Sequence, residues 1–254
     1  MSLQEKAARF SALHQADQPL VLTNVWDAGS AKAVAAAGAS ALATSSWAIA
    51  AAHGYEDGEA LPLALAIATV ERIARTSPLP VSADIEGGYG DTPQDAARTL
   101  QHFMDAGVVG INFEDRRVHG PGLFDMDEHA SRIAAMRAVA DKGGIAIFIN
   151  ARTDIFFGGG GDTRRAALMD EAVARAHAYA AAGANGLFVP GLSEPDLICD
   201  LCARVCLPVN IMMSADTPSL ADLARLGVRR MSTGPGTYLA AMASVTQSVE
   251  RMDY

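Results

Sequence analysis

The stretch PVSADIEGGYGDTPQDAARTLQHFMDAGVVGINFED, residues 80–115, contains two short apolar runs separated by an alanine-rich run with helical spacing. The first apolar run, Pro80 to Glu86, and the second, Val108 to Asp115, have the length and composition of strands that are buried on both faces. Parallel strands need a crossover between them, and a helix is the usual one. The stretch therefore predicts a strand–helix–strand unit of a parallel sheet.

The same alternation extends in both directions along the chain. Further strand-like runs occupy residues 20–26, 41–46, 145–154, 185–190, 208–213 and 228–233, again with helical segments between them. Eight such units in about 250 residues are typical of a (β/α)8 TIM barrel. Because no segment resembles a linker, we expect one domain that covers residues 1–254.

The positions of four glycines support the prediction of a barrel. Four helical segments end at a glycine that suits the left-handed position after a helix, namely Gly38, Gly107, Gly183 and Gly227. A doubly wound open sheet is the competing architecture. It is disfavoured because the turn after the first strand lacks the G-x-G-x-x-G fingerprint of dinucleotide-binding folds.

The predicted strands end in polar residues, which is unusual for buried strands. Asp84 and Glu86 lie two positions apart, so alternation along a strand places both carboxylates on one face. Like charges on a buried face repel each other and are costly to desolvate, and a bound cation is the simplest compensation. The other polar strand ends include Asn24, Ser45, Ser46, Asn112, Glu114, Asn150, Arg152, Asp154, Asn210 and Ser232.

These residues predict an active site, because barrel enzymes work at the carboxyl-terminal ends of their strands. Carboxylates without histidine or cysteine suit Mg²⁺ or Mn²⁺. Arg152 would grip a carboxylate or phosphate through its guanidinium fork. The alternative is that the acids form structural ion pairs, although acids would then outnumber cations at the mouth.

Composition excludes several other classes of protein. The formal net charge is -9 and no cluster of lysine or arginine is present, so we expect neither nucleic acid nor an anionic membrane as partner. No apolar run is long enough to span a bilayer, and residues 1–15 read as an amphipathic helix and not as a signal peptide. The odd number of cysteines favours a reducing compartment, and hence the cytoplasm. Cys199, Cys202 and Cys206 are predicted to form a buried small-residue stripe on a helix rather than a metal cluster.

Six motifs together resemble the isocitrate lyase and phosphoenolpyruvate mutase superfamily. They are residues 24–59, VSADIEGGYGD, VVGINFED, INARTD, GLFVPG and LPVNIM, and the resemblance extends from about Leu20 to Gly236. It implies a (β/α)8 barrel whose last helix is exchanged with a neighbouring subunit. It also implies a metal-stabilised enolate mechanism that makes or breaks C–C or P–C bonds in small 2-oxo and 2-hydroxy acids.

The resemblance assigns roles to individual residues. It implies metal binding by Asp57, Asp84, Glu86 and Glu114, and substrate binding by Ser45, Ser46, Trp47, Asp84, Arg152 and Asn210. Asp57 is predicted by the resemblance alone, since strand periodicity gives no signal for it.

The segment after the fourth strand departs from the superfamily pattern. Residues 114–133, EDRRVHGPGLFDMDEHASRI, contain neither the cysteine of the lyases nor the lysine of the mutases. His119 is the general-acid candidate there, and Arg152 is the other predicted catalytic residue. We expect a Mg²⁺-dependent enzyme that cleaves or decarboxylates a small 2-oxo or 2-hydroxy dicarboxylate through an enolate. The alternatives are a phosphonate mutase or hydrolase, and a non-catalytic oxo-acid binding protein.

Two further segments carry predictions. Residues 237–254 form a helix whose apolar residues Leu239, Met242, Val245 and Val249 recur at helical spacing. This stripe either closes the chain's own barrel or, as the resemblance implies, packs on a partner subunit in a homodimer or homotetramer. The glycine run at residues 158–161 reads as a surface loop or an active-site flap.

Overall fold

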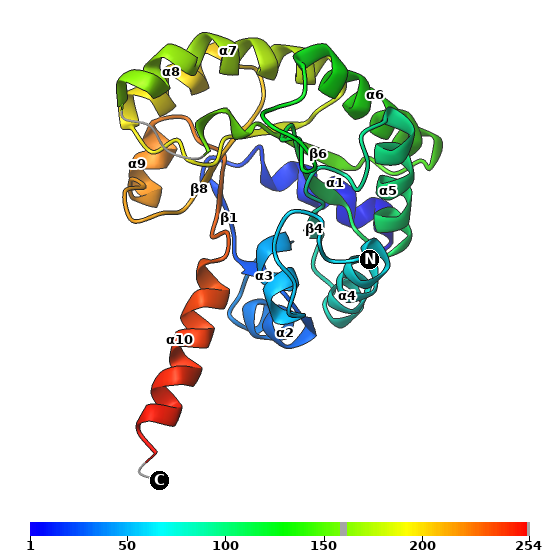
Figure 1. Ribbon diagram of the computed structural model, residues 1–254, viewed down its shortest axis with the longest axis vertical. Helices are drawn as coiled ribbons and strands as arrows, with labels where there is room; N and C mark the ends of the chain where they lie inside the picture. The colour runs from blue at the N-terminus through cyan, green and yellow to red at the C-terminus, as the bar shows by residue number, and fades with distance from the viewer. Residues whose placement is uncertain (158–161, 253–254) are drawn as a thin grey trace.

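The computed structural model describes residues 1–157 and 162–252, so the prediction for the glycine run lies outside the described residues. Parallel strands alternate with helices around a barrel (Figure 1). The strands are β1 (Leu20–Leu22), β2 (Asn24–Val25), β3 (Leu42–Thr44), β4 (Val81–Asp84), β5 (Gly110–Glu114), β6 (Phe148–Arg152), β7 (Gly186–Phe188), β8 (Val209–Met212) and β9 (Arg230–Ser232).

The sheet closes through its first segment. Its strand order is β1-β9-β8-β7-β6-β5-β4-β3-β2, and every neighbouring pair is parallel. Because β1 and β2 are separated only by Thr23, the two ends of this order belong to one stretch of chain. The nine strands therefore occupy eight positions, as the predicted (β/α)8 barrel requires.

Most of the helices cover the outside of the barrel (Figure 1). They are α1 (Leu3–Leu13), α2 (Ala28–Ala36), α3 (Ser46–Ala52), α4 (Leu63–Thr76), α5 (Pro93–Asp105), α6 (Met126–Lys142), α7 (Asp162–Ala181), α8 (Pro195–Arg204), α9 (Leu220–Arg225) and α10 (Gly236–Glu250). The predicted glycines at 38, 107, 183 and 227 have φ angles of 92°, 92°, 102° and 94°, which confirms their role in ending helices.

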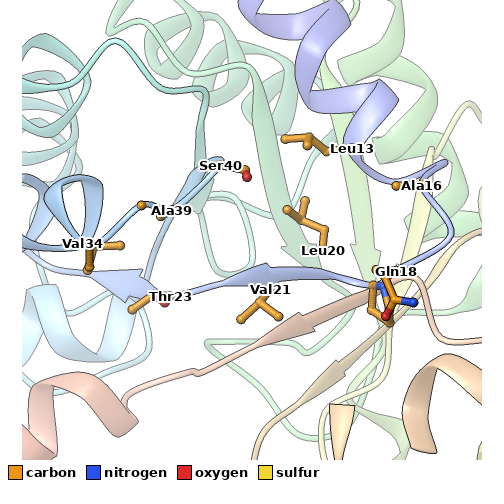
Figure 2. Close-up of a pocket in the computed structure, with 12 residues that line it drawn as sticks. Leu13, Ala16, Gln18, Leu20, Val21, Thr23, Val34, Ala39 and Ser40 are labelled. Atoms are coloured by element: carbon orange, nitrogen blue, oxygen red, sulfur yellow. The ribbon is translucent and has the colours of Figure 1, made fainter. Parts of the chain in front are cut away.

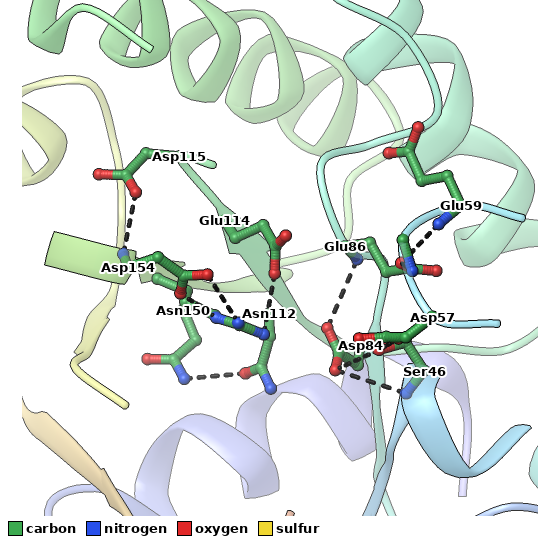
Figure 3. Close-up of polar contacts among 12 residues, drawn as sticks. Ser46, Asp57, Glu59, Asp84, Glu86, Asn112, Glu114, Asp115, Asn150 and Asp154 are labelled. Carbon is green, nitrogen blue, oxygen red and sulfur yellow. Dashed lines mark hydrogen bonds and ion pairs between the residues drawn. The ribbon is translucent and has the colours of Figure 1, made fainter. Parts of the chain in front are cut away.

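The strands are shorter than predicted, and one consequence is a correction. Strand β4 ends at Asp84, and Glu86 has a φ of 52°, outside the strand conformation. Strand alternation therefore does not set the direction of the Glu86 side chain, although the two carboxylates do lie close together (Figure 3). Ile85 and Glu86 keep backbone hydrogen bonds to Asn112 and Glu114 of β5 at 3.1 and 3.0 Å, and the chain then turns at the mouth.

The amino-terminal end of the barrel is closed by α1. Phe10 of α1 and Phe148 of β6 pack edge to face with ring centroids 5.6 Å apart. His14 follows α1 and stacks on Phe148 at 3.9 Å, while its Nδ1 lies 2.8 Å from the Phe10 carbonyl oxygen. The opposite, carboxyl-terminal end of the strands is left open for a site.

The last helix, α10, extends away from the barrel (Figure 1). None of its described residues is buried, and Leu239, Met242, Val245 and Val249 are 39–57% exposed. Its first turn contacts the barrel: the Thr237 hydroxyl donates to the Asn24 carbonyl oxygen at 2.6 Å, and the Tyr238 ring meets those of Trp26 and Trp47 at 5.2 and 5.9 Å. Within one chain, the helix therefore does not cover the barrel.

The cysteine prediction is wrong in two respects. Cys199 and Cys206 are exposed, and only Cys202 is partly buried against the core. Helix α8 ends at Arg204, so Cys206 does not continue the stripe that helical spacing suggested. No described helix is both long and apolar enough to cross a membrane.

Candidate active site at the barrel mouth

A cavity of about 230 Å³ lies at the carboxyl-terminal ends of the strands. Most of its charged and polar lining was predicted from the strand ends. The lining consists of Asn24, Ser45, Ser46, Trp47, Asp57, Asp84, Asn112, Arg152, Phe157, Phe188, Met212, Ser232, Gly234 and Pro235. Pockets for drug-sized ligands measure about 300–1,000 Å³, so this cavity suits a smaller molecule.

A second cavity, of about 470 Å³, is larger but chemically poor (Figure 2). It lies near the amino-terminal end of the barrel, between the segment after α1, strand β1 and helix α2. Its lining contains no titratable side chain; Leu13, Val21 and Val34 are among its apolar members. We therefore place the candidate active site at the smaller cavity.

Asp57 and Asp84 meet at one serine of the mouth. The Ser46 hydroxyl lies 3.0 Å from Asp84 Oδ2 and 3.4 Å from Asp57 Oδ1 (Figure 3). Burial raises the pKa of Asp57, and the neighbouring Asp84 carboxylate raises it further. The structure therefore brings together the acid predicted from the strand end and the acid predicted only by resemblance.

Glu86 lies behind this pair and is 5% exposed. Its Oε2 accepts hydrogen bonds from the backbone amides of Gly58 and Glu59 at 2.8 and 2.7 Å. Burial raises the pKa of Glu86 to about 7, and the carboxylates of Asp57 and Asp84 contribute to the increase. The three acids thus form a cluster in which burial and like charges outweigh the attraction that Arg152 exerts on Asp57.

Arg152 is held by acids on two sides. Its Nη1 lies 2.8 Å from Glu114 Oε2, and its Nε and Nη2 donate to the two carboxylate oxygens of Asp154 at 2.5 and 2.8 Å. Burial alone lowers the pKa of this guanidinium, but Glu114 and Asp154 outweigh that effect and raise it. Glu114 and Asp154 thus form ion pairs with Arg152, whereas Asp57, Asp84 and Glu86 form none with any residue that the structure describes.

The acid cluster fits a hard cation in charge and in donor type. Besides burial, Asp84 raises the pKa of Asp57, and both of these carboxylates raise the pKa of Glu86; a divalent ion would relieve this repulsion, and oxygen donors suit Mg²⁺. However, within residues 1–157 and 162–252, no three His, Cys, Asp or Glu side chains are arranged to hold an ion directly. An ion here would take one or two carboxylates and several waters, as Mg²⁺ commonly does.

The remaining predicted substrate residues lie at different depths. Ser45 caps α3 through a 3.3 Å bond from the Ala48 amide, and Trp47 lies at the rim, 37% exposed. Asn210 is fully buried and does not line the cavity; its Oδ1 accepts from Ser232 at 3.4 Å. Asn210 therefore supports the mouth from below in this structure.

His119 does not line the cavity. Its Nε2 lies 3.4 Å from Glu59 Oε2, and its side chain is 66% exposed, whereas that of Glu59 is 4% exposed. The loop that carries His119 is closed by a bridge between Arg116 and Leu123. Reasoning from the sequence missed Glu59, because nothing in its spacing distinguishes it from other loop acids.

Sequence reasoning also missed several residues that line or support the mouth. Phe157, Phe188 and Met212 form its apolar wall, and Arg230 lies buried in β9. The signal for Arg230 was available, since it precedes Ser232 by two positions and so shares its face of the strand.

Comparison with protein families identifies relatives over nearly the whole chain. Residues 10–253 match the model of the family described as phosphoenolpyruvate phosphomutase. An uncharacterised protein of Mycobacterium tuberculosis (strain ATCC 25618 / H37Rv) is 34% identical over 235 residues, which are 92% of this chain and 84% of that protein. Oxaloacetate decarboxylase of Bradyrhizobium sp. (strain BTAi1 / ATCC BAA-1182) is 30% identical over 71% of this chain and 60% of its own length.

Solved structures agree with this relationship. A provisionally assigned phosphonomutase from Burkholderia cenocepacia J2315 has a TM-score of 0.95 and 52% identity, covering 98% of this chain and 99% of its own. A 2,3-dimethylmalate lyase, described as a member of the PEP mutase/isocitrate lyase superfamily, has a TM-score of 0.83 and 29% identity over 98% of this chain and 88% of its own.

Proposed function

Because the chain belongs to the phosphoenolpyruvate phosphomutase family, we propose that it is a Mg²⁺-dependent lyase that cleaves or decarboxylates a small 2-oxo or 2-hydroxy dicarboxylate. The relatives named for such activities are oxaloacetate decarboxylase, 2,3-dimethylmalate lyase and the 2-methylisocitrate lyase of Bacillus subtilis (strain 168), which is 27% identical over 84% of this chain. The proposal concerns the substrate class, the metal and the residues that act on the substrate.

One observation carries the proposal: a cavity of about 230 Å³ brings a buried guanidinium opposite an acid cluster. Arg152 uses three of its five N–H donors on Glu114 and Asp154, which leaves two for a substrate carboxylate. On the other side, Asp57, Asp84 and Glu86 offer oxygen ligands for a divalent cation. A small dicarboxylate could contact both sides at once.

The residues of the mouth then have separate tasks. When bound, Mg²⁺ supplies a Lewis acid that stabilises negative charge on an oxygen of the substrate. Arg152 orients one carboxylate, with Asp154 and Glu114 fixing the plane of its guanidinium. Ser46 and Trp47 border the substrate, and Phe157 and Phe188 exclude water from the opposite wall.

The missing lid cysteine favours decarboxylation over cleavage of a 2-hydroxy acid. Cleavage requires a base that removes the hydroxyl proton, and residues 114–133 contain no cysteine or lysine for this purpose. Loss of CO2 from a carboxylate attached to C3 of a 2-oxo dicarboxylate needs no such base, because the electron pair of the broken C–C bond becomes the C2–C3 double bond of an enolate and the C2 carbonyl oxygen takes the negative charge. The resulting enolate needs a proton only afterwards.

His119 is the proposed donor of that proton. It lies 3.4 Å from Glu59 and outside the cavity lining, so its loop would have to move toward the mouth. Loss of a general acid lowers turnover by about 10²–10⁴-fold. His119→Asn should therefore lower kcat by at least 100-fold if the role is correct, and an unchanged kcat would assign protonation to solvent.

The second candidate is a phosphonate mutase or hydrolase, favoured by the 52% identity to the provisionally assigned phosphonomutase. One assay distinguishes the candidates. The protein is incubated with Mg²⁺ and oxaloacetate, phosphonopyruvate or 2-methylisocitrate, and products are followed by NMR against a heat-inactivated control. We expect turnover of oxaloacetate and little or none of 2-methylisocitrate. Turnover of phosphonopyruvate alone would support the second candidate, and binding without turnover would indicate the non-catalytic oxo-acid binding protein.

A further inference from the structure

We propose that Arg230, buried inside the barrel, is a positioning residue that turns the Asn112 amide so that its N–H donors face the anionic substrate at the mouth. This inference rests on the proposed function, since the ligand it concerns is the oxo acid of that site. It gives a role to a charged side chain that none of the tasks above requires.

Arg230 lies under the cavity and crosses the interior. It is 1% exposed and sits in β9, paired in register with Asn210 of β8 and Leu20 of β1. In the strand order, β8, β7 and β6 separate β9 from β5, so these two strands face each other across the barrel. The guanidinium therefore spans the barrel to reach Asn112 of β5, 118 positions away in the sequence.

The contact at Asn112 fixes the direction of a chain of hydrogen bonds. Arg230 Nη2 donates to Asn112 Oδ1 at 3.0 Å, and Asn150 Nδ2 donates to the same oxygen at 2.9 Å. A guanidinium has no acceptor, so Asn112 must turn its oxygen toward Arg230. Asn150 must then present its nitrogen, which is the orientation seen in Figure 3.

The other end of the Asn112 amide is left for the mouth. Both lone pairs of Oδ1 are used, and Asn112 lines the cavity. Among the described residues, Nδ2 of Asn112 has no hydrogen-bond partner within the protein. A fixed N–H donor in a largely buried site stabilises an anion without any cost of reorientation.

The positive charge of Arg230 also favours binding of an anion at the mouth. No carboxylate in the described part of the chain forms an ion pair with it, and its Nε and Nη1 have no partner there. Burial lowers its pKa to about 9, and the carboxylate of Asp84 acts against that decrease. A buried cation without an ion-pair partner is destabilising, so a role in attracting the substrate anion explains its presence better than packing does.

The packing role and the positioning role predict different effects of an Arg230 substitution on the binding of Mg²⁺ and of the anion. If Arg230 only fills the barrel, replacing it disturbs the mouth as a whole and weakens both ligands together. If it positions Asn112 and attracts the anion, its loss weakens the anion alone. The Mg²⁺ affinity should then stay unchanged or increase, because a positive charge has been removed from beneath the acid cluster.

The experiment uses Mg²⁺ alone, and oxalate in saturating Mg²⁺, as calorimetric probes of wild type, Arg230→Met, Arg230→Lys, Asn112→Ala and the double variant Arg230→Met/Asn112→Ala. We expect Arg230→Met to weaken oxalate binding about 10- to 100-fold without weakening Mg²⁺ binding. Arg230→Lys should recover part of the loss. The double variant should lose less than the sum of the single variants, because both act through one amide.

The matched control is Arg137→Met. Arg137 lies on α6 outside the barrel, where it binds the Gly183 carbonyl, so its loss should lower stability and leave oxalate binding unchanged. Parallel weakening of Mg²⁺ and oxalate in Arg230→Met, or additive losses in the double variant, would overturn the inference. If Arg230→Met does not fold, unchanged oxalate affinity in Asn112→Ala would overturn it as well. A wild-type protein that binds no oxalate contradicts the proposed function itself.

Discussion

The carboxyl group of Glu86 illustrates how single residues set the chemistry of the mouth. It is buried, yet it accepts hydrogen bonds from the Gly58 and Glu59 amides and lies beside two further carboxylates. Backbone donors stabilise the charged form of a carboxyl group, while burial and like charges destabilise it. Since the pKa of Glu86 is raised to about 7, the second pair of effects dominates. A cation in this cluster would reverse that balance.

Asp84 is the residue with which to test the metal proposal. Asp84→Asn keeps the shape of the side chain but removes one charge from the cluster shared with Asp57 and Glu86. We expect calorimetry at pH 7.5 to show Mg²⁺ affinity reduced by at least tenfold, because a charged oxygen ligand is lost. Asp105→Asn, an exposed acid at the end of α5, is the control. Equal Mg²⁺ affinity in the Asp84 variant would rule out this location for the ion.

A substitution at Arg152 tests the proposal that this residue binds a substrate carboxylate. Arg152→Lys keeps the positive charge but replaces the planar fork, which binds Asp154 through two hydrogen bonds, with a single ammonium group. We expect oxalate binding in saturating Mg²⁺ to weaken by about 1.5–3 kcal/mol, with Mg²⁺ affinity itself little changed. An oxalate affinity within twofold of wild type would exclude Arg152 as the carboxylate anchor.

At the scale of secondary-structure elements, α1 has a role that its sequence alone did not reveal. It lies across the amino-terminal end of the barrel, where Phe10 and the following His14 pack on Phe148. His14 is 2% exposed, and burial, together with the charge of Arg230, lowers its pKa to about 3. The amino-terminal end of the barrel is thus packed around a histidine that is neutral in the native state.

This predicts a pH dependence of stability. Above about pH 6.5, the usual pKa of histidine, His14 is neutral in both states and its full contribution is present. As the pH falls below that value, His14 becomes protonated in the unfolded chain, whereas in the native state it stays neutral until about pH 3, its lowered pKa. The free energy of unfolding should therefore decrease by about 1.4 kcal/mol per pH unit from this group.

Urea unfolding at pH 7.0, 6.0 and 5.0 measures the effect. His14→Gln removes the titrating group, so its free energy of unfolding should fall less steeply with decreasing pH than that of wild type. His102→Gln, on the exposed side of α5, should leave the wild-type slope unchanged. Parallel slopes in wild type and His14→Gln would show that His14 becomes protonated in the native state.

At the scale of the whole molecule, α10 is the element that a single chain leaves unexplained. Its apolar residues Leu239, Met242, Val245 and Val249 are exposed along one side, and the helix points away from the barrel (Figure 1). A contiguous apolar stripe of this kind marks an interaction surface. We propose that it packs on a partner barrel in a homodimer or homotetramer, because exchange of this helix between two identical subunits buries the apolar stripe of both.

Light scattering at micromolar concentration tests this proposal. Full-length protein should be a dimer or tetramer, and Val245→Glu should shift it toward smaller species, because a charge would be buried in the interface. Ser244→Glu, on the other side of the helix, is the matched control. A monomeric full-length protein would contradict the exchange, and an intact oligomer in a chain ending at Gly236 would show that other surfaces hold the assembly.

Local sequence patterns were sufficient to predict the order of strands and helices around the barrel. The eight strand segments and the four helix-ending glycines were all predicted, because they depend on the periodicity and conformational preferences of neighbouring residues. These patterns also placed Asp84 and Arg152 at the mouth, since parallel strands bring their carboxyl ends to one side. Strand lengths were overestimated because the chain leaves the extended conformation soon after the last strand residues, as at Glu86, whose φ is 52°.

The contacts between side chains of the mouth depend on how distant segments pack in the folded barrel. Arg152 could have faced a substrate or an acid, and only the register of β5 and β6 places Glu114 beside it. His119 turned toward Glu59 because two loops happen to approach each other there. Arg230 reaches Asn112 only because closing the barrel brings β9 opposite β5. Such contacts join residues far apart in the sequence, and local spacing carries no information about them.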